Sequence, residues 1–371
     1  MNVTKQTGRV SSPLVVTLVG PVPPPAGGMA MQTAQLLRLL TETSQLEVKL
    51  VAVNPPYRPG WIANIPVLRA LFRLVPYFWQ LHKACKHTDV IHLMANSGWA
   101  WHLFAAPAIW IAHWHKVPVI VNYRGGLAAD FLKKQQRWVL PSLRKAHAIV
   151  TPSAFLQGVF AQYKLKCQVI PNIVDTSIFK GEIKPGLATA PHLVVTRNLE
   201  AIYDIASAIR AFAIVSKQLP EARLSIAGSG PEHAALQRLV SQLQLTDSVV
   251  FCGKLDRRQM ADLYASADIM LNPSTADNMP NSLLEAMAAN VLVVSTNVGG
   301  IPFMVEDQHD ALLVAPTAPE QMAAAVLCLV QQPQLSQQLS NAARHKVNQY
   351  QPDQVLPGWL QLYQQLGCAD A

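Results

Sequence analysis

The chain has 371 residues, half of them apolar and only 14% charged, which is enough sequence for roughly two domains with buried cores. Its five cysteines are scattered and form no C-x-x-C pair, which argues against a disulfide framework and a cysteine zinc site. They favour a reducing, cytoplasmic compartment. The polar stretch Met1–Ser12 lacks an apolar signal core, so we expect no export.

Charge is distributed unevenly along the chain. Residues 1–180 carry 19 lysines and arginines against five acids, a net charge of +14, whereas the remainder carries 11 against 17. A basic half is typical of proteins that meet nucleic acid, an acidic polymer or an anionic membrane surface. Because no nucleic-acid reader motif accompanies it, we expect no nucleic-acid partner.

The first predicted elements are a strand at 14–19, a Pro/Gly loop at 20–28 and a helix at 29–40. Further strands are predicted at 48–53, 89–93, 117–122, 148–151 and 168–170. Between Glu47 and Asp89, cations alternate with aromatic residues, among them Arg58, Trp61 and Trp79. This segment indicates an amphipathic helix at a membrane interface, or alternatively an ordinary core helix with a basic solvent side.

The run Gly98–Trp114 is the one transmembrane suspect. It spans 17 residues and contains His102, His113 and Pro107, short of the roughly 20 uninterrupted apolar positions that a spanning helix needs. We therefore predict a buried helix between two strands.

A second series of strands is predicted at 193–196, 223–227, 248–251, 269–272, 291–295 and 311–314, and Lys180–Pro191 is the best linker. Alternating strands and helices predict an α/β protein with two doubly wound, Rossmann-like parallel-sheet domains facing each other across a cleft. Ligands of such sheets bind beyond the carboxyl ends of the strands. Small or basic loops follow several of these ends, at Arg124–Gly126, Arg197–Asn198, Gly228–Pro231 and Gly253–Lys254.

The most informative loop is Asp277–Ala288, in which two carboxylates, Asp277 and Glu285, lie on either side of a predicted helix start. Pro280 suits the first helical position, and the backbone N–H groups of a helix start favour a phosphate. Two acids beside a bound phosphate can hold hydroxyl groups on both of its sides. A nucleotide sugar has this layout, although a solvated helix start with an acidic residue is the alternative interpretation.

Several segments, taken in order, resemble the retaining GT-B glycosyltransferases of the family 4 type, also called glycosyl transferases group 1. The matching pieces are Ala26–Met29, Asp89–His92, Val169–Asp175, Ile226–Pro231, Asp277-x7-Glu285 and Val298–Pro302. The resemblance implies a GT-B fold with an acceptor-binding domain at 1–182, a nucleotide-sugar-binding domain at 183–350 and a C-terminal helix at 351–371 that crosses back to the first domain.

Residue by residue, the resemblance places Glu285 on the donor ribose, and Asp277 with the amides of 278–282 near the sugar and diphosphate. Arg197 would meet the phosphates, and Gly28 would bring its amide close to them from the other domain. The implied donor-binding set is Gly28, Arg197, Asn198, Gly230, Gly253, Lys254, Asn278, Met279, Pro280, Asn281, Ser282 and Glu285. The candidate catalytic set is Asp277, Arg197, Arg124 and His92.

Two positions depart from the family pattern. Many members carry a lysine five positions after the phosphate-binding arginine, where this chain has Ile202. A second phosphate cation must then come from elsewhere. Arg124 stands where family members often have His followed by Gly, and it is the leading candidate, because a guanidinium can grip an anion with two parallel hydrogen bonds. His92 matches a family position at a strand end, where a packing role is the alternative.

The resulting hypothesis is sugar transfer with retention, from a UDP-linked donor to a saccharide or lipid-linked saccharide in surface polysaccharide biosynthesis. Cations and a helix start would neutralise the leaving diphosphate, so we expect no metal and no cofactor. We expect a cytoplasmic protein, with a possible peripheral site on the inner face of the cytoplasmic membrane. A nucleotide-sugar epimerase of GT-B fold and a non-catalytic, membrane-recruited partner are the alternatives.

Overall fold

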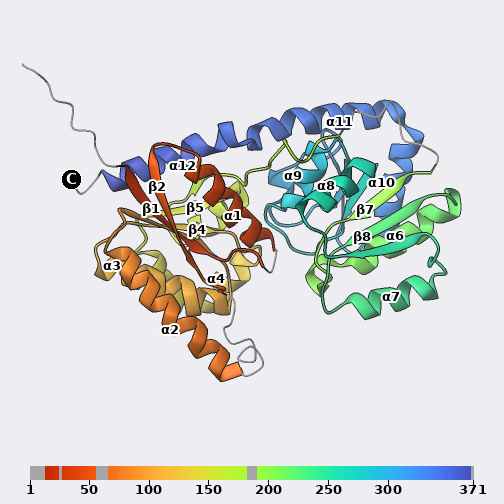
Figure 1. Cartoon of the computed structure of the whole chain (residues 1–371). Helices are drawn as coiled ribbons and strands as arrows, with labels where there is room; N and C mark the ends of the chain where they lie inside the picture. Colours follow the sequence, from red (N-terminus) through yellow and green to blue (C-terminus); the bar gives the residue numbers. More distant parts are fainter. Residues whose placement is uncertain (1–12, 25–26, 56–65, 182–189, 369–371) are drawn as a thin grey trace, which may run out of the picture. The chain divides into compact units, whose positions relative to one another are not determined.

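The computed structural model describes residues 13–24, 27–55, 66–181 and 190–368. Figure 1 shows two groups of strands, each accompanied by helices. All twelve predicted strands are present, with their ends shifted by at most two residues. The predicted linker Lys180–Pro191 lies largely outside the described residues, as do Arg58 and Trp61.

The first sheet has the strand order β2-β1-β3-β4-β5-β6, in which β1 pairs in parallel with β2 and β3, and β5 with β6. Its strands are β1 (Leu14–Gly20), β2 (Leu46–Ala52), β3 (Val90–Ala95), β4 (Val119–Tyr123), β5 (Ala148–Thr151) and β6 (Gln168–Val169). Every residue of β3 and β4 is buried, as expected for central parallel strands covered on both faces.

The helices that alternate with these strands are α1 (Gly28–Thr41), α2 (Pro66–Cys85), the π-helical turn η2 (Trp101–Ala105), α3 (Ala106–Trp114), α4 (Ala128–Leu143) and α5 (Ala154–Ala161). The prediction of a buried helix at 98–114 holds only in part. Trp101 and Ile109 are fully buried, whereas Trp99 and Trp114 are 78% and 80% exposed. Among the described residues, no helix has both the length and the apolar character needed to cross a membrane.

The second sheet is parallel throughout, in the order β12-β11-β10-β7-β8-β9. Its strands are β7 (His192–Val195), β8 (Arg223–Ala227), β9 (Val249–Gly253), β10 (Ile269–Asn272), β11 (Leu292–Thr296) and β12 (Leu312–Val314). The helices that follow are α6 (Ile205–Gln218), α7 (His233–Gln242), α8 (Arg257–Ser266), α9 (Asn281–Ala288), α10 (Pro319–Gln331), α11 (Pro333–Val347) and α12 (Pro352–Gly367).

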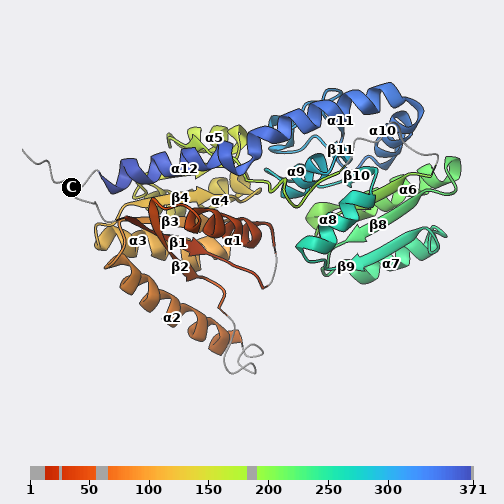
Figure 2. The same cartoon turned by 45° about the horizontal axis from the view of Figure 1, so that its top comes forward.

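Strand β10 shows how this sheet builds a core on each face. Ile269 and Leu271 join the cluster that contains Phe212 of α6 and Val326 of α10. Met270, pointing the other way, joins the cluster with residues of α8, α9 and α11. The two cores fix the carboxyl ends of β7 to β11, and Figure 2 shows the helices on both sides of the strands.

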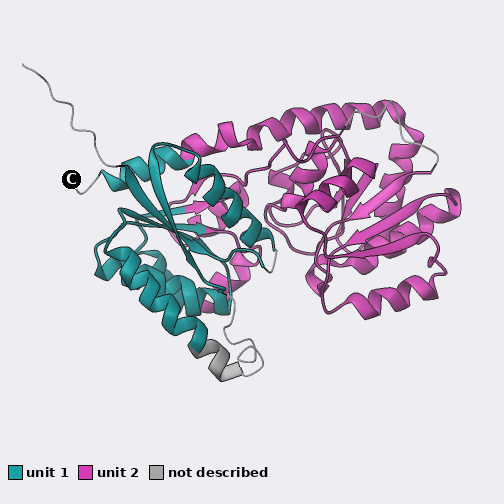
Figure 3. Ribbon diagram, in the orientation of Figure 1, with its two compact units in different colours: residues 1–122, 136–149, 359–371 teal, residues 123–135, 150–358 magenta. Residues whose placement is uncertain are grey.

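The chain forms two compact units, coloured separately in Figure 3. Unit 1 contains residues 1–122, 136–149 and 359–371, and unit 2 contains 123–135 and 150–358. The end of α12 therefore belongs to unit 1, together with β1 to β3. The predicted domain limits at 182 and 350 stay a prediction.

Candidate active site

The loops that follow β7 and β8 in unit 2 are packed directly on each other through glycine. A Cβ on Gly228 would lie 2.0 Å from the carbonyl oxygen of Arg197, and one on Gly230 would lie 2.3 Å from that of Leu199. Gly228 also has φ +155°, a conformation that side chains rarely adopt. Because these residues are glycines, the loop after β8 can pack directly against the backbone around Arg197 and hold it in place.

Arg197 follows β7, and its guanidinium is surrounded by groups from the loop before α9, from α9 itself and from its own loop. It forms an ion pair with the carboxylate of Asp277, and its Nη1 donates to Ser282 Oγ at 3.2 Å. The ring of Tyr203 lies 4.1 Å from the guanidinium carbon, a cation–π contact. The side chains of Arg197 and Asp277 are only 11% and 14% exposed, so little water screens their charges.

Asp277 and Asn278 lie in the loop between β10 and α9. Asp277 Oδ1 accepts a hydrogen bond from the backbone N–H of Asn278 at 2.9 Å, and the Oδ1 of Asn278 accepts one from Ser153. Within the described part of the chain, two buried donors have no hydrogen-bond partner here, Asn278 Nδ2 and Arg197 Nε. Because buried donors without an acceptor are costly, this pair favours a ligand that brings acceptor oxygens.

Helix α9 begins at Asn281, with Pro280 as its extended N-cap residue, one position later than predicted. The first backbone N–H groups of such a helix have no acceptor within the helix. The preceding loop is held by the glycines after β11. Gly300 N donates to the carbonyl oxygen of Asp277 at 3.1 Å, and Gly299 has φ +54°. A Cβ on Gly299 would lie 2.0 Å from that same carbonyl oxygen.

Glu285 lies one turn into α9, partly buried. Burial raises the pKa of its carboxyl group to about 7, although the nearby charges of Arg257 and Arg197 act in the opposite direction. Arg257 begins α8, and its Nη2 donates to Asp175 Oδ2 at 3.2 Å. Unit 2 thus places two guanidinium groups close enough to Glu285 to affect its ionisation.

Arg124 also lies in unit 2, but the structure shows it in a side-chain network behind the helix start. Its Nη1 donates to Asn172 Oδ1 at 2.5 Å, and burial lowers the pKa of its guanidinium to about 10. Asn172 Nδ2 donates in turn to Asn281 Oδ1 at 2.7 Å and to the carbonyl oxygen of Met279 at 2.9 Å. Arg124 is therefore tied to the loop that precedes α9, and its catalytic role stays a prediction.

Other predicted residues lie at the margin of this group or outside it. Lys254 and Asn198 are exposed, and Asn198 Nδ2 donates to Glu200 at 3.1 Å. Gly253 has φ +67°, and its carbonyl oxygen accepts a hydrogen bond from Gly228 N at 2.8 Å. The position of Ile202 is fixed by its carbonyl oxygen, which accepts hydrogen bonds from Thr275 N and Oγ1, both at 2.9 Å.

Gly28 and His92 belong to unit 1. Gly28 begins α1, and beyond its own neighbours in the helix no atom of the described residues lies within 4 Å of the place where its Cβ would be. His92 is fully buried, with Nδ1 at 2.6 Å from the hydroxyl of Tyr363 and Nε2 at 2.9 Å from Asn122 Nδ2. Its ring also lies 4.4 Å from that of Trp359, so His92 holds the end of α12 on the first sheet.

Sequence reasoning assigned no role to Arg257, Asn172 or Tyr203. Asn172 and Asp175 lie in the matching segment Val169–Asp175, so the sequence indicated that this segment matters but did not predict their contacts. Arg257 lies only three residues beyond the Gly253–Lys254 turn. It was missed because no local pattern separates it from its neighbour Arg258, which is exposed.

Two parallel sheets of six strands each and a charged helix start beyond the carboxyl end of β10 define the GT-B class of glycosyltransferases. Two family models match the chain, one described as Glycosyltransferase Family 4 over residues 26–178 and one as Glycosyl transferases group 1 over residues 190–332. The chain belongs to this family of GT-B glycosyltransferases, as its motifs predicted.

Individual relatives are distant. The chain is 25% identical over 229 residues to N-acetyl-alpha-D-glucosaminyl L-malate synthase of Bacillus anthracis, a match that covers 60% of this chain and 56% of the relative. It is 26% identical over 218 residues to alpha-monoglucosyldiacylglycerol synthase of Streptococcus pneumoniae, covering 50% and 48%. The matches thus span about half the length of these two relatives.

A solved structure shows the same fold over nearly the whole chain. HepE of Anabaena, determined in complex with UDP and glucose, superposes with a TM-score of 0.74 at 19% sequence identity. The superposition covers 96% of this chain and all of HepE. At this identity the likeness concerns the fold.

Proposed function

We propose that this protein transfers a sugar, with retention at the anomeric carbon, from a UDP-linked donor to a saccharide or lipid-linked saccharide acceptor. The observation that carries the proposal is the group formed by Arg197, the Asp277–Asn278 loop and the start of α9. It combines a guanidinium, a helix N-terminus and two buried donors, Arg197 Nε and Asn278 Nδ2, that find no acceptor among the residues that the structure describes. A diphosphate supplies the acceptor oxygens and the negative charge that such a group favours.

Glu285 and Arg257 support the nucleoside part of the donor. A carboxylate one turn into the helix can accept hydrogen bonds from the two ribose hydroxyls while the helix start holds the phosphate. The elevated pKa of Glu285, about 7, reflects a site with little water, in which such hydrogen bonds are strong. The UDP bound in HepE supports the choice of uridine as the nucleoside.

The mechanism that these residues support needs positioning and charge stabilisation more than covalent chemistry. Arg197 and the α9 start would stabilise the departing diphosphate, whose oxygen takes the proton of the acceptor hydroxyl on the same face of the sugar. Asp277 would orient the sugar hydroxyls. We include independence from metal ions in the proposal, because the guanidinium of Arg197 and the start of α9 can stabilise the charge of the leaving group.

The acceptor is proposed from the distribution of charge along the chain. A lipid-linked or acidic saccharide suits the basic first half of the chain, which carries a net charge of +14 over residues 1–180. One of the relatives, alpha-monoglucosyldiacylglycerol synthase, is named after a glycolipid, which supports a lipid-linked acceptor. We infer a role at the cytoplasmic face of the membrane, in the assembly of surface polysaccharide.

The donor assignment is tested by thermal denaturation of the purified protein with UDP, GDP, ADP and a panel of nucleotide sugars. We expect UDP or a UDP-sugar to raise the melting temperature, and Arg257→Ala to weaken the shift while the matched exposed variant Arg258→Ala preserves it. Absence of a shift with every nucleotide would refute the proposal. Addition of EDTA is expected to leave transfer unchanged.

Two further measurements separate the alternatives. NMR of the anomeric proton of the product distinguishes retention from inversion, and an inverted product contradicts the same-face mechanism. Incubation with donor alone, followed by analysis of the nucleotide sugar, detects an epimerase. A non-catalytic partner is indicated if no donor binds and Glu285→Ala leaves the phenotype of the cell unchanged.

A further inference from the structure

Helices α2 and α3 of unit 1 lie side by side along one face of the first sheet, as Figures 1 and 2 both show. Right-handed crossovers explain this placement, because the connections from β2 to β3 and from β3 to β4 progress in the same direction across the sheet. The end of α4 joins them through Trp110 of α3, whose Nε1 donates to Ser142 Oγ at 3.0 Å. The three helices form one continuous outer layer of unit 1.

This layer exposes large apolar side chains to an unusual extent. Trp79 of α2 is 65% exposed, Trp110 of α3 is 46% exposed, and Trp138 of α4 is 77% exposed. The exposed large apolar residues of these helices and of the segment just before α3 are Phe72, Val75, Trp79, Trp99, Leu103, Trp110, Trp114 and Trp138. The sequence of unit 2 contains no tryptophan. A gathering of this size on one layer indicates an interaction surface.

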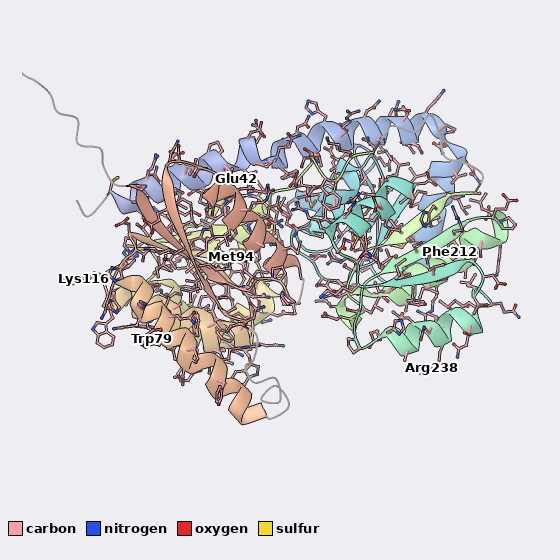
Figure 4. The ribbon with its side chains drawn as sticks, viewed as in Figure 1. Glu42, Trp79, Met94, Lys116, Phe212 and Arg238 are labelled. Carbon is pink, nitrogen blue, oxygen red and sulfur yellow. The ribbon has the colours of Figure 1, made fainter. Side chains whose placement is uncertain are left out.

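The spacing shows that these residues are arranged rather than scattered. Phe72, Val75 and Trp79 recur at intervals of three and four along α2, which places them on one side of that helix. The opposite side of α2 carries Tyr77 and Leu81, which are buried against the unit. Trp110 and Trp114 are likewise separated by four residues on α3. Figure 4 shows Trp79 on α2 at the outside of the unit and Met94 within the sheet.

Lysines accompany the tryptophans at close range. The amino group of Lys83 lies 5.5 Å from the ring centre of Trp79, and that of Lys145 lies 5.7 Å from the ring centre of Trp110. Further cations of the same elements and their ends are Lys86, Lys116, Arg137 and Arg144. Between 66 and 122 and between 136 and 149, the sole acid is Asp89, and its carboxylate accepts a hydrogen bond from Val15 N at 2.7 Å. The layer is therefore both apolar and strongly positive.

We propose that α2, α3 and the end of α4 form a docking layer for the surface of an anionic lipid bilayer. Indole rings prefer the headgroup region, where their apolar body meets acyl chains and their N–H meets water. Lysine and arginine beside them reach the lipid phosphates while their methylene groups cover apolar surface. The complementarity between these cations and the lipid phosphates favours a bilayer over a partner protein, since protein interfaces are depleted in lysine.

The test uses the full-length protein and sedimentation with vesicles, in the absence of any nucleotide sugar. We expect binding to phosphatidylcholine vesicles that contain phosphatidylglycerol, and at least about tenfold weaker binding to phosphatidylcholine alone. Lipids brominated on the acyl chains should quench the tryptophan fluorescence. The triple variant Trp79→Ala, Trp114→Ala, Trp138→Ala is expected to lose about tenfold in affinity and most of the quenching, with an unchanged melting temperature.

Matched controls lie in unit 2. Phe303→Ala removes an aromatic side chain that is 61% exposed and should leave binding unchanged. The charge variant Lys83→Gln, Lys86→Gln, Lys116→Gln should weaken binding, whereas Arg210→Gln, Lys217→Gln, Arg238→Gln should not. Arg238 is labelled on α7 in Figure 4.

Three results overturn the proposal. The first is no binding to any vesicle, and the second is binding that persists in the triple tryptophan variant and is not quenched by bromine. The third is a discrete oligomer, seen by light scattering in the absence of vesicles, that the wild type forms and the triple variant does not. This result would assign the layer to a contact between protein molecules. Because vesicle binding is measured without donor, failure here is independent of failure in the nucleotide screen.

Discussion

Arg197 and Asp277, from the loops after β7 and β10, neutralise each other in a nearly buried ion pair beside the start of α9. The sequence predicted that Arg197 meets the phosphates and that Asp277 lies near the sugar and diphosphate, but it predicted no contact between the two side chains. The pairing means that a donor diphosphate would meet a guanidinium whose charge is already partly balanced. The charge of Arg197 should therefore favour binding of the diphosphate, whereas the charge of Asp277 should oppose binding and favour sugar transfer. Substitution of each residue alone separates the two effects.

Asp277→Asn keeps the shape of the side chain and removes its charge. We expect UDP to bind at least as tightly as to the wild type, because the repulsion between carboxylate and diphosphate is removed. Sugar transfer should fall by about 100-fold, since the sugar hydroxyls lose their charged acceptor. Calorimetric titration with UDP and a transfer assay measure the two effects.

Arg197→Ala is the opposing variant. It is expected to weaken UDP binding by about 10-fold to 100-fold, the range of a hydrogen bond to a charged group. It also leaves Asp277 without its partner, which should lower the free energy of unfolding by about 2 kcal/mol. Equal losses of UDP affinity in the two variants would contradict separate roles for the two charges.

The ionisation of Glu285 predicts a pH-dependent stability. Its carboxyl group has a pKa of about 7 in the folded protein against an ordinary value of 4.5, so the folded state binds a proton that the unfolded state has released. The contribution to stability is complete below pH 4.5 and is lost as the pH rises through about 7. Each pKa unit corresponds to about 1.4 kcal/mol.

Glu285→Gln has no such proton to lose. The difference in free energy of unfolding between variant and wild type should therefore be small at acid pH and grow in favour of the variant towards about pH 8. Urea denaturation across this range gives the difference curve, in which other titrating groups cancel. A flat difference curve would show that Glu285 titrates normally.

Gly300 tests the close packing behind the helix start. A Cβ at this position would lie 2.1 Å from the carbonyl oxygen of Asn278, which must then move away. We expect Gly300→Ala to destabilise the protein by about 2 kcal/mol, as overpacking does, and to weaken UDP binding through displacement of the Asp277–Asn278 loop.

Gly158→Ala is the matched control, because Gly158 lies inside α5 and, beyond the helix's own backbone, no atom of the described part of the chain lies within 4 Å of the place that a Cβ would take. Alanine should stabilise that helix by about 0.5 to 1 kcal/mol and leave UDP binding unchanged. Thermal denaturation with and without UDP compares the two. A normal UDP response in Gly300→Ala would show that the loop position does not matter for binding.

The strands and their order of appearance were predictable because buried parallel strands are short apolar runs between turn signals, as at Val119–Tyr123. The identity of the helix start at Asn281 was also predictable, since proline and two acids mark it locally. The contacts of Arg124 with Asn172 and of Arg257 with Asp175 were not, because they join positions 48 and 82 residues apart. Likewise, the exposure of Trp99 and Trp114 depends on which side of a uniformly apolar segment meets the sheet.

His92 offers a test between a catalytic and a structural role. Asn122 Nδ2 donates to His92 Nε2, so the remaining ring hydrogen is on Nδ1, in the bond to the Tyr363 hydroxyl. Nδ1 thus serves the attachment of α12, and Nε2 ties the ring to β4. Tyr363→Phe removes the hydroxyl that accepts this hydrogen bond and should lower the free energy of unfolding by about 1 to 2 kcal/mol.

A double-mutant cycle then decides between the roles. If His92 is structural, His92→Phe combined with Tyr363→Phe should cost clearly less than the sum of the single variants, because the two side chains share one hydrogen bond. At temperatures where all variants stay folded, transfer by His92→Phe should lie within about tenfold of the wild type. A loss of about 100-fold or more in kcat, with unchanged stability, would instead support His92 as a catalytic base.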